Sequence, residues 1–190
     1  MLVLLLLVDE KMAEMPILIL WTGPKHSGKT TRALDLVNSA IEEGFRITGL
    51  LALSIYNDGI LNGFYAYDLA STIKKPLAKR NNVQGKSGFT FISEGLKIGV
   101  KALSENSLKN TDLIILDEYG PFELSGRIWR KSVDSILSSG NIATLLVVRE
   151  ELVKDVIELY SHIPHEIIEA NQPDSIGKVL NILKHRRQIL

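Results

Sequence analysis

A glycine-rich turn between an apolar strand and a helix is the feature that most constrains the fold. Residues 16–21 (PILILW) are short, apolar and bounded by turn residues, which predicts a buried strand. Residues 31–43 carry apolar side chains at helical spacing, and Gly44 is a typical helix stop. The turn between them, GPKHSGKT at 23–30, satisfies the pattern G-x-x-x-x-G-K-[S/T] in full.

The chemistry of this turn indicates a phosphate site. Glycines let backbone N–H groups curl around an anion, and the first turn of the helix adds unpaired N–H groups and a partial positive charge. Lys29 would neutralise the terminal phosphates, and the Thr30 hydroxyl suits a magnesium ligand. The residues predicted to contact phosphate are Gly23, Pro24, Lys25, His26, Ser27, Gly28, Lys29, Thr30 and Thr31. The side chains at 25 and 26 are also compatible with a purely solvent-facing position.

The rest of the chain predicts an α/β domain. Buried strands at 113–116, 142–148 and 166–169 alternate with helices at 123–137, 150–160 and 174–186, which is typical of a parallel sheet covered on both faces. The middle of the chain predicts an antiparallel hairpin, short added strands and one helix. These segments are 47–56 and 60–67 around Asp58-Gly59, the strands 77–79 and 89–93, and the helix 95–103. Ligands bind such sheets at the carboxyl ends of the strands.

Two carboxylates directly follow the buried strand LIIL. Asp117 would hold magnesium at the ligand edge of the sheet, and Glu118 would act as general base toward an attacking water. The alternative is that Asp117 only caps the strand and Glu118 faces solvent.

Two further residues follow predicted strands at the same edge. Arg149 could stabilise charge on the transferred phosphoryl group, or form a salt bridge with Glu150 or Glu151. Asn171 could contact the nucleotide base, or only turn the chain into the last helix.

Composition limits the class of protein. Lys plus Arg (22) equals Asp plus Glu (22), so no basic surplus indicates a nucleic-acid partner, and the lack of cysteine fits an intracellular, cytoplasmic protein. Residues 1–15 form an apolar extension ahead of a domain at 16–190. MLVLLLLV is too short to span a bilayer and lacks the flanks of a secretory signal, so no membrane role is expected. The extension could be an edge strand, an oligomer contact or a partner-covered tail, or the true start could be Met12 or Met15.

The segments TGPKHSGKTT and LILDEYGPFEL, with the hairpin-like stretch 49–64, resemble the THEP-type, or cancer-related, nucleoside-triphosphatases over about residues 17–183. The resemblance implies a three-layer, RecA-like P-loop fold with a mainly parallel sheet and an antiparallel hairpin insertion. It implies slow, Mg²⁺-dependent hydrolysis of ATP, GTP and other nucleoside triphosphates, and a role for Glu123, which is also compatible with a simple first-turn acid.

Other classes of P-loop protein fit less well. No Asn-Lys-x-Asp stretch is present to recognise guanine, and no room exists after residue 148 for the arginine-bearing lid of a nucleotide kinase. A phosphotransferase acting on a small molecule and a non-enzymatic nucleotide switch remain alternatives. A pocket formed by residues 44–91 opposite the γ-phosphate would favour the phosphotransferase.

Overall fold

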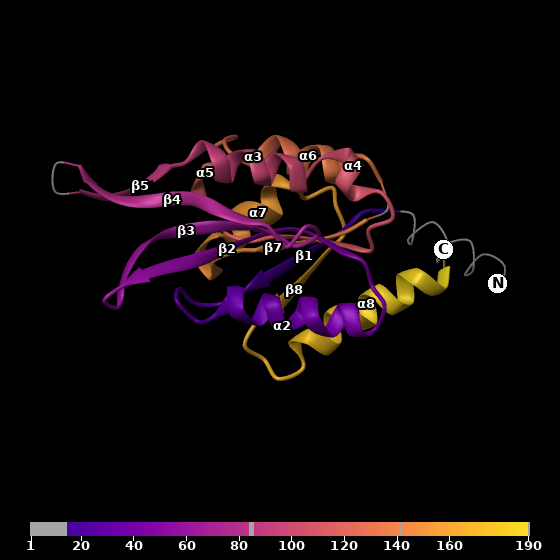
Figure 1. Cartoon of the computed structure of the whole chain (residues 1–190). Helices are drawn as coiled ribbons and strands as arrows, with labels where there is room; N and C mark the ends of the chain where they lie inside the picture. Colours follow the sequence, from indigo (N-terminus) through magenta and orange to yellow (C-terminus); the bar gives the residue numbers. More distant parts are fainter. Residues whose placement is uncertain (1–14, 84–85, 141, 190) are drawn as a thin grey trace, which may run out of the picture.

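The computed structural model describes residues 15–83, 86–140 and 142–189, which form one mixed sheet with helices on both faces (Figure 1). The strands are β1 (Ile17–Thr22), β2 (Ile47–Asn57), β3 (Ile60–Asp68), β4 (Lys74–Val83), β5 (Lys86–Phe91), β6 (Leu113–Leu116), β7 (Ala143–Val147) and β8 (His165–Glu169). The α-helices are α2 (Lys29–Glu42), α3 (Ser93–Ala102), α4 (Glu105–Leu108), α5 (Pro121–Leu124), α6 (Arg130–Ser138), α7 (Val153–Leu159) and α8 (Ser175–Ile189). A 3₁₀ turn, η1 (Glu150–Leu152), leads into α7.

The strand order is β5-β4-β3-β2-β6-β7-β1-β8. Strands β2, β6, β7, β1 and β8 are parallel to one another, and Ile115, Leu145 and Ile19 stand side by side on β6, β7 and β1. All three side chains are fully buried, because helices cover both faces of this part of the sheet. In this strand order β7 lies between β1, which leads into the phosphate loop, and β6, which leads into the paired carboxylates.

The antiparallel part of the sheet is larger than a hairpin. Strands β2 and β3 pair as predicted around Asp58 and Gly59, both with positive φ, and β4 and β5 continue the antiparallel order. The segments 77–79 and 89–93, predicted as short strands, belong to longer strands, and Ser93 already begins a helix. We call β3, β4, β5 and residues 53–57 of β2 the arm; it projects beyond the helical layers in Figure 1.

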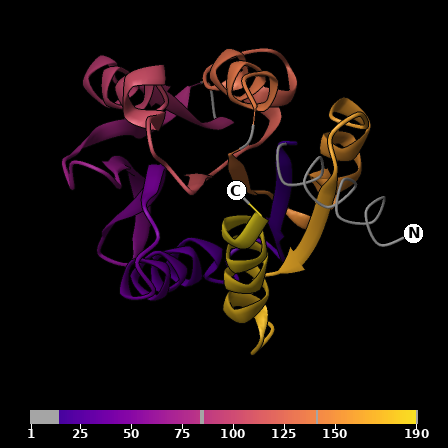
Figure 2. The ribbon, with the colours of Figure 1, turned by 90° about the vertical axis from the view of Figure 1, so that its right-hand side faces the viewer.

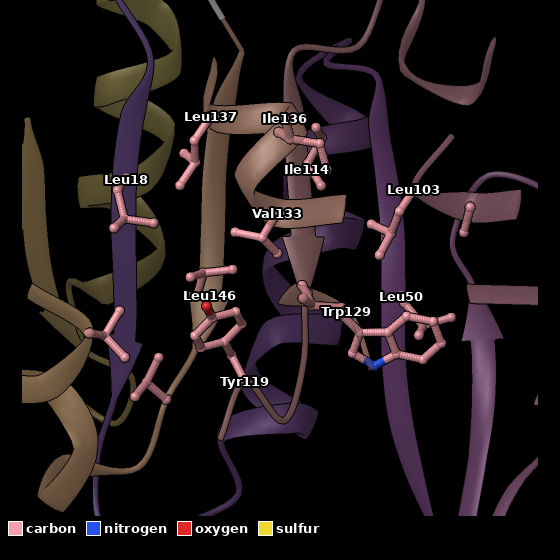
Figure 3. Close-up of a cluster of buried hydrophobic side chains, with 14 of the residues drawn as sticks. Leu18, Leu50, Leu103, Ile114, Tyr119, Trp129, Val133, Ile136, Leu137 and Leu146 are labelled. Carbon is pink, nitrogen blue, oxygen red and sulfur yellow. The ribbon is translucent and has the colours of Figure 1, made fainter. Parts of the chain in front are cut away.

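Two apolar cores hold the layers together. Helices α2 and α8 cover one face of the sheet, and α3, α6 and α7 cover the other (Figures 1 and 2). On the second face Trp129 and Tyr119 pack with aliphatic side chains of the sheet and of α6 (Figure 3). Burial of these side chains fixes α6 over the central strands.

The prediction of one continuous helix over 123–137 is wrong. The segment forms two helices, α5 and α6, separated by residues 125–129 in which Gly126 (φ 81°) and Ile128 (φ 50°) are left-handed. The break allows the indole of Trp129 to enter the core, where it lies against Gly99 of α3. Helical periodicity did not reveal this, because the contact joins residues far apart in the sequence.

The strand predicted over 16–21 and the helix over 31–43 correspond to β1 and α2, and the helix over 174–186 corresponds to α8. Of the predicted N-terminal extension, residues 1–14 lie outside the described part of the chain. Within the described residues, no helix combines the length and the apolar character that crossing a bilayer requires.

Candidate active site

The phosphate loop joins the carboxyl end of β1 to the start of α2. Gly23 (φ 150°) and Gly28 (φ 82°) take backbone angles that favour glycine, and His26 (φ 61°) is also left-handed. A Cβ atom at position 23 would lie 3.3 Å from Ser27 Oγ, so the loop is closely folded on itself. The indole of Trp21 donates to the Lys29 carbonyl at 3.2 Å and ties the strand to the helix. The loop is therefore a preformed concave turn at a helix N-terminus, which suits an anion.

Lys29 lies across this loop. Its Nζ donates to the carbonyls of Gly23 (3.0 Å) and Pro24 (2.7 Å). Burial lowers the pKa of Lys29, while the nearby Glu118 and Asp117 carboxylates act in the opposite direction. The Lys29 ammonium group and both carboxylates lie at the same edge of the sheet and line one cavity.

Asp117 is held at the end of β6 by three donors. Its Oδ2 accepts from the Ala52 amide at 3.2 Å, its Oδ1 accepts from the Glu118 amide at 2.9 Å, and the Thr30 side chain also hydrogen-bonds to it. The side chain is buried, and burial raises its pKa to about 7, with a further contribution from Glu118.

The Thr30–Asp117 pair fits a magnesium ion. A hydroxyl and a carboxylate already in contact offer the hard oxygen ligands that Mg²⁺ prefers, and a cation there would offset the charge of the buried carboxylate. Mg²⁺ commonly takes only one or two protein carboxylates and completes its shell with phosphates and water. The loop beside this pair is where those phosphates would lie.

Glu118 lines the same cavity as the phosphate loop. It has a φ of 59°, a left-handed conformation that is uncommon for a non-glycine residue and that clusters at functional sites. Arg149 Nη2 lies 3.5 Å from Glu118 Oε2. The sequence analysis offered Glu150 or Glu151 as salt-bridge partners for Arg149; its partner in the structure is Glu118.

Buried contacts behind Glu118 fix the segment that carries it. Glu123 Oε2 accepts from the Gly120 amide at 2.9 Å in a capping arrangement, and burial raises the pKa of this carboxyl to about 7. The Tyr119 and Tyr160 hydroxyls lie 2.7 Å apart, and Tyr160 donates to Asp134 at 2.8 Å. The Tyr160–Asp134 contact was not predicted, because no local sequence pattern signals a contact between residues so far apart in the chain.

The loop opens into a cavity of about 970 Å³ that continues onto the arm. Its lining includes every predicted loop residue from 25 to 31 and also Asp117, Glu118 and Arg149. Asn171 is exposed just beyond the end of β8 and does not line the cavity; its contact with a base stays a prediction. Other lining residues were not predicted individually: Leu34, Leu53, Ser54, Tyr56, Leu61, Phe64, Arg80, Phe89, Tyr119 and Val147.

Comparison with known proteins agrees with this geometry. A protein family described as NTPase matches residues 18–187. The chain belongs to the THEP1-type family of P-loop nucleoside-triphosphatases. It is 32% identical to the nucleoside-triphosphatase THEP1 of Methanocaldococcus jannaschii over 144 residues, which are 74% of this chain and 84% of that protein. The THEP1 of Methanothermobacter thermautotrophicus is also 32% identical, over 70% of this chain and 78% of its own length.

A solved structure shares the fold. The solution structure of a human cancer-related nucleoside triphosphatase superposes with a TM-score of 0.62 and 19% identity, covering 90% of this chain and 96% of the human one. The family membership confirms the resemblance noted from the phosphate loop and the DEYGPFEL segment, and with it the class of enzyme, a nucleoside-triphosphatase.

Proposed function

We propose that the protein hydrolyses nucleoside triphosphates, ATP and GTP among them, to the diphosphate and phosphate in a Mg²⁺-dependent reaction. The observation that carries the proposal is the convergence of Lys29, the Thr30–Asp117 pair and Glu118 on one edge of the sheet. The names of the relatives support the reaction type. The lack of cysteine supports a reducing, cytoplasmic setting.

Binding relies on the loop. Backbone N–H groups of Gly23 and of residues 25–30, with the N-terminus of α2, receive the phosphates, and the Lys29 ammonium exchanges its two carbonyl partners for phosphate oxygens. Thr30 and Asp117 would hold Mg²⁺, which when bound would neutralise negative charge on the phosphates. Asn171 remains a candidate for contact with the base at the β8 side of the loop.

Glu118 orients and deprotonates the attacking water. The water oxygen forms a bond to the γ-phosphorus, the bond from phosphorus to the β,γ-bridging oxygen breaks, and the proton of the water passes to the Glu118 carboxylate. Arg149, paired with Glu118 at 3.5 Å, orients that carboxylate and supplies positive charge toward the transferred phosphoryl group.

Two substitutions separate binding from chemistry. We expect Lys29→Ala to weaken nucleotide binding, because the loop loses the ammonium group that lies across it. We expect Glu118→Gln to retain binding but to lower turnover about 10²–10⁴-fold, the usual contribution of a general base. Nucleotide binding by calorimetry and phosphate release are measured for each variant with ATP, GTP, CTP and UTP.

Glu158→Gln, which changes an exposed carboxylate on α7, is the control and should behave as the wild type. Undiminished turnover in Glu118→Gln would remove the assignment of the base. Unchanged binding in Lys29→Ala would remove the phosphate site from this loop.

Phosphoryl transfer to a small-molecule acceptor is the second candidate. It is favoured by the extension of the cavity past Glu118 onto the arm, which leaves space beyond the γ-phosphate. The same assay separates the two reactions, because a transferase consumes nucleotide without releasing an equal amount of free phosphate.

A further inference from the structure

The cavity has two chemically different halves. One half consists of the phosphate loop, Asp117, Glu118 and Arg149. The other, which we call the arm half, is formed by strands β2 to β5. Its lining residues are Leu53, Ser54, Tyr56, Leu61, Phe64, Arg80 and Phe89. Sites for small molecules usually measure about 300–1,000 Å³, so a cavity of about 970 Å³ has room beside a triphosphate.

The direction of the nucleotide leaves the arm half open. Glu118, the proposed base toward the γ-phosphorus, directly follows Asp117, so these two carboxylates mark the γ end of the triphosphate. The Ala52 amide bonds to Asp117, and the next residues of β2 begin the arm half. The γ end of the triphosphate therefore faces the arm, and the base projects from the opposite end of the phosphate chain.

The side chains that line the arm half favour a ligand with a planar ring. The ring centroids of Phe64 and Phe89 lie 5.1 Å apart, and 37% of Phe89 is accessible to solvent. Tyr56 is 58% exposed and also lines the arm half. Aromatic side chains that flank an open space favour stacking with a planar ligand.

The charge of the arm half selects for an anion. Arg80 lines it and donates to the Leu61 carbonyl at 3.2 Å, which places the guanidinium at the wall of the cavity. Arg149 lies at the boundary with the phosphate half. The described residues that line the arm half include Arg80 and no Asp or Glu.

We propose that the arm half binds a second small molecule, with a planar aromatic ring and an anionic group, next to the γ end of the nucleotide. The ring stacks on Phe89, and the anionic group pairs with Arg80, the cross-strand neighbour of Phe89. The proposal rests on the proposed nucleotide function only for the orientation of the triphosphate. A molecule in this place meets Glu118 directly, so it can replace the attacking water or restrict it.

The fluorescent probe 8-anilinonaphthalene-1-sulfonate, an aromatic sulfonate, tests the site. Titrations are carried out with the free protein and with protein saturated with Mg²⁺ and the non-hydrolysable ATP analogue AMP-PNP. We expect one saturable site per chain that persists when the phosphate loop is filled. Phe89→Ala and Arg80→Gln should each raise the Kd of the probe about fivefold or more, because each removes one part of the recognition.

Matched controls use one aromatic and one basic residue outside the cavity. Phe122 is 38% exposed, nearly the same as Phe89, and Lys79 neighbours Arg80 on β4. Phe122→Ala and Lys79→Gln should leave the Kd of the probe unchanged.

The proposal is overturned if the wild type shows no saturable site, if AMP-PNP displaces the probe, or if the cavity variants match their controls. Failure of the nucleotide function has a different signature, because AMP-PNP itself would then not bind.

Discussion

Asp117 combines a buried position with a carboxylate neighbour. Burial and Glu118 raise its pKa to about 7, whereas the hydrogen bonds from Thr30, Ala52 and the Glu118 amide act to lower it. Near neutral pH the nucleotide-free protein therefore contains both the protonated and the charged forms of this carboxyl. A carboxyl that holds a metal must be deprotonated, so at the proposed site binding of Mg²⁺ with nucleotide would be coupled to loss of that proton.

We predict that the thermal stabilisation given by Mg²⁺ and AMP-PNP grows between pH 6 and pH 8. The folded pKa of Asp117, about 7, lies above the usual unfolded value of about 3.9. The folded state thus binds more protons between these values, and the free energy of unfolding of the nucleotide-free protein falls as pH rises through this window. Below the folded pKa, coupled binding gains up to about tenfold in affinity per pH unit. Melting temperatures with and without ligand measure the effect.

Glu123→Gln is the control for this prediction. Glu123 also has a pKa raised to about 7, but it bonds to Gly120 and is not placed to hold the metal. The amide oxygen of glutamine can still accept from Gly120, so the growth of the ligand-induced shift should persist. An equal shift at pH 6 and pH 8 in the wild type would contradict the role of Asp117.

The candidate functional residues that could be predicted from the sequence are those that stand in or next to a recognisable local pattern. Lys29 and Thr30 follow from the loop pattern, and Asp117 and Glu118 follow from the strand that precedes them; the structure brings all four together. The arm half of the cavity could not be predicted residue by residue. Phe64 and Phe89 meet only after two antiparallel pairings have set their register.

At the scale of elements, Gly99 explains how α3 and Trp129 pack. A Cβ at this position would overlap the indole ring, so only glycine allows the helix backbone to approach Trp129 so closely. Trp129 is buried and stands directly before α6. The break between α5 and α6 thus depends on a tertiary contact, which is why helical periodicity in the sequence did not predict it. Strands β1 and β6 were predicted because their apolar runs are local.

We predict opposite effects for two glycine substitutions in helices. Gly99→Ala should lower the free energy of unfolding by about 1–3 kcal/mol, because overpacking forces the Trp129 ring or α3 to move. Gly177→Ala in α8 meets open space and should raise the free energy of unfolding by about 0.4–1 kcal/mol through reduced backbone entropy of the unfolded chain. Urea denaturation measures both. A neutral Gly99→Ala would show that the indole can shift without cost.

At the scale of the whole molecule, the central strands and the arm differ in burial. Side chains of β6, β7 and β1 are buried under helices on both faces, whereas much of the arm surface is accessible to solvent. Helix α3 contacts the inner part of the arm through β3 and β4. Local opening is favoured where few apolar contacts must be broken.

We predict that hydrogen exchange follows this division. The amides of Ile114, Ile115 and Leu145 should exchange only through global unfolding, whereas those at the arm end of the β4–β5 pair should exchange at least about 100-fold faster through local opening. Exchange measured by mass spectrometry on peptic fragments distinguishes the two regions. Uniform protection across the sheet would contradict the prediction and indicate that the arm unfolds together with the core.

The position of β7 between β1 and β6 also sets a length. Adjacent strands lie about 4.8 Å apart, so the intervening strand holds the ends of the other two at a spacing of roughly 10 Å. This span is defined by main-chain pairing from Ile19 through Leu145 to Ile115, not by the size of any side chain. The paired strands thus fix the distance between the end of β1, where the phosphate loop begins, and Asp117 at the end of β6, and conservative changes in the side chains of β7 leave that distance intact.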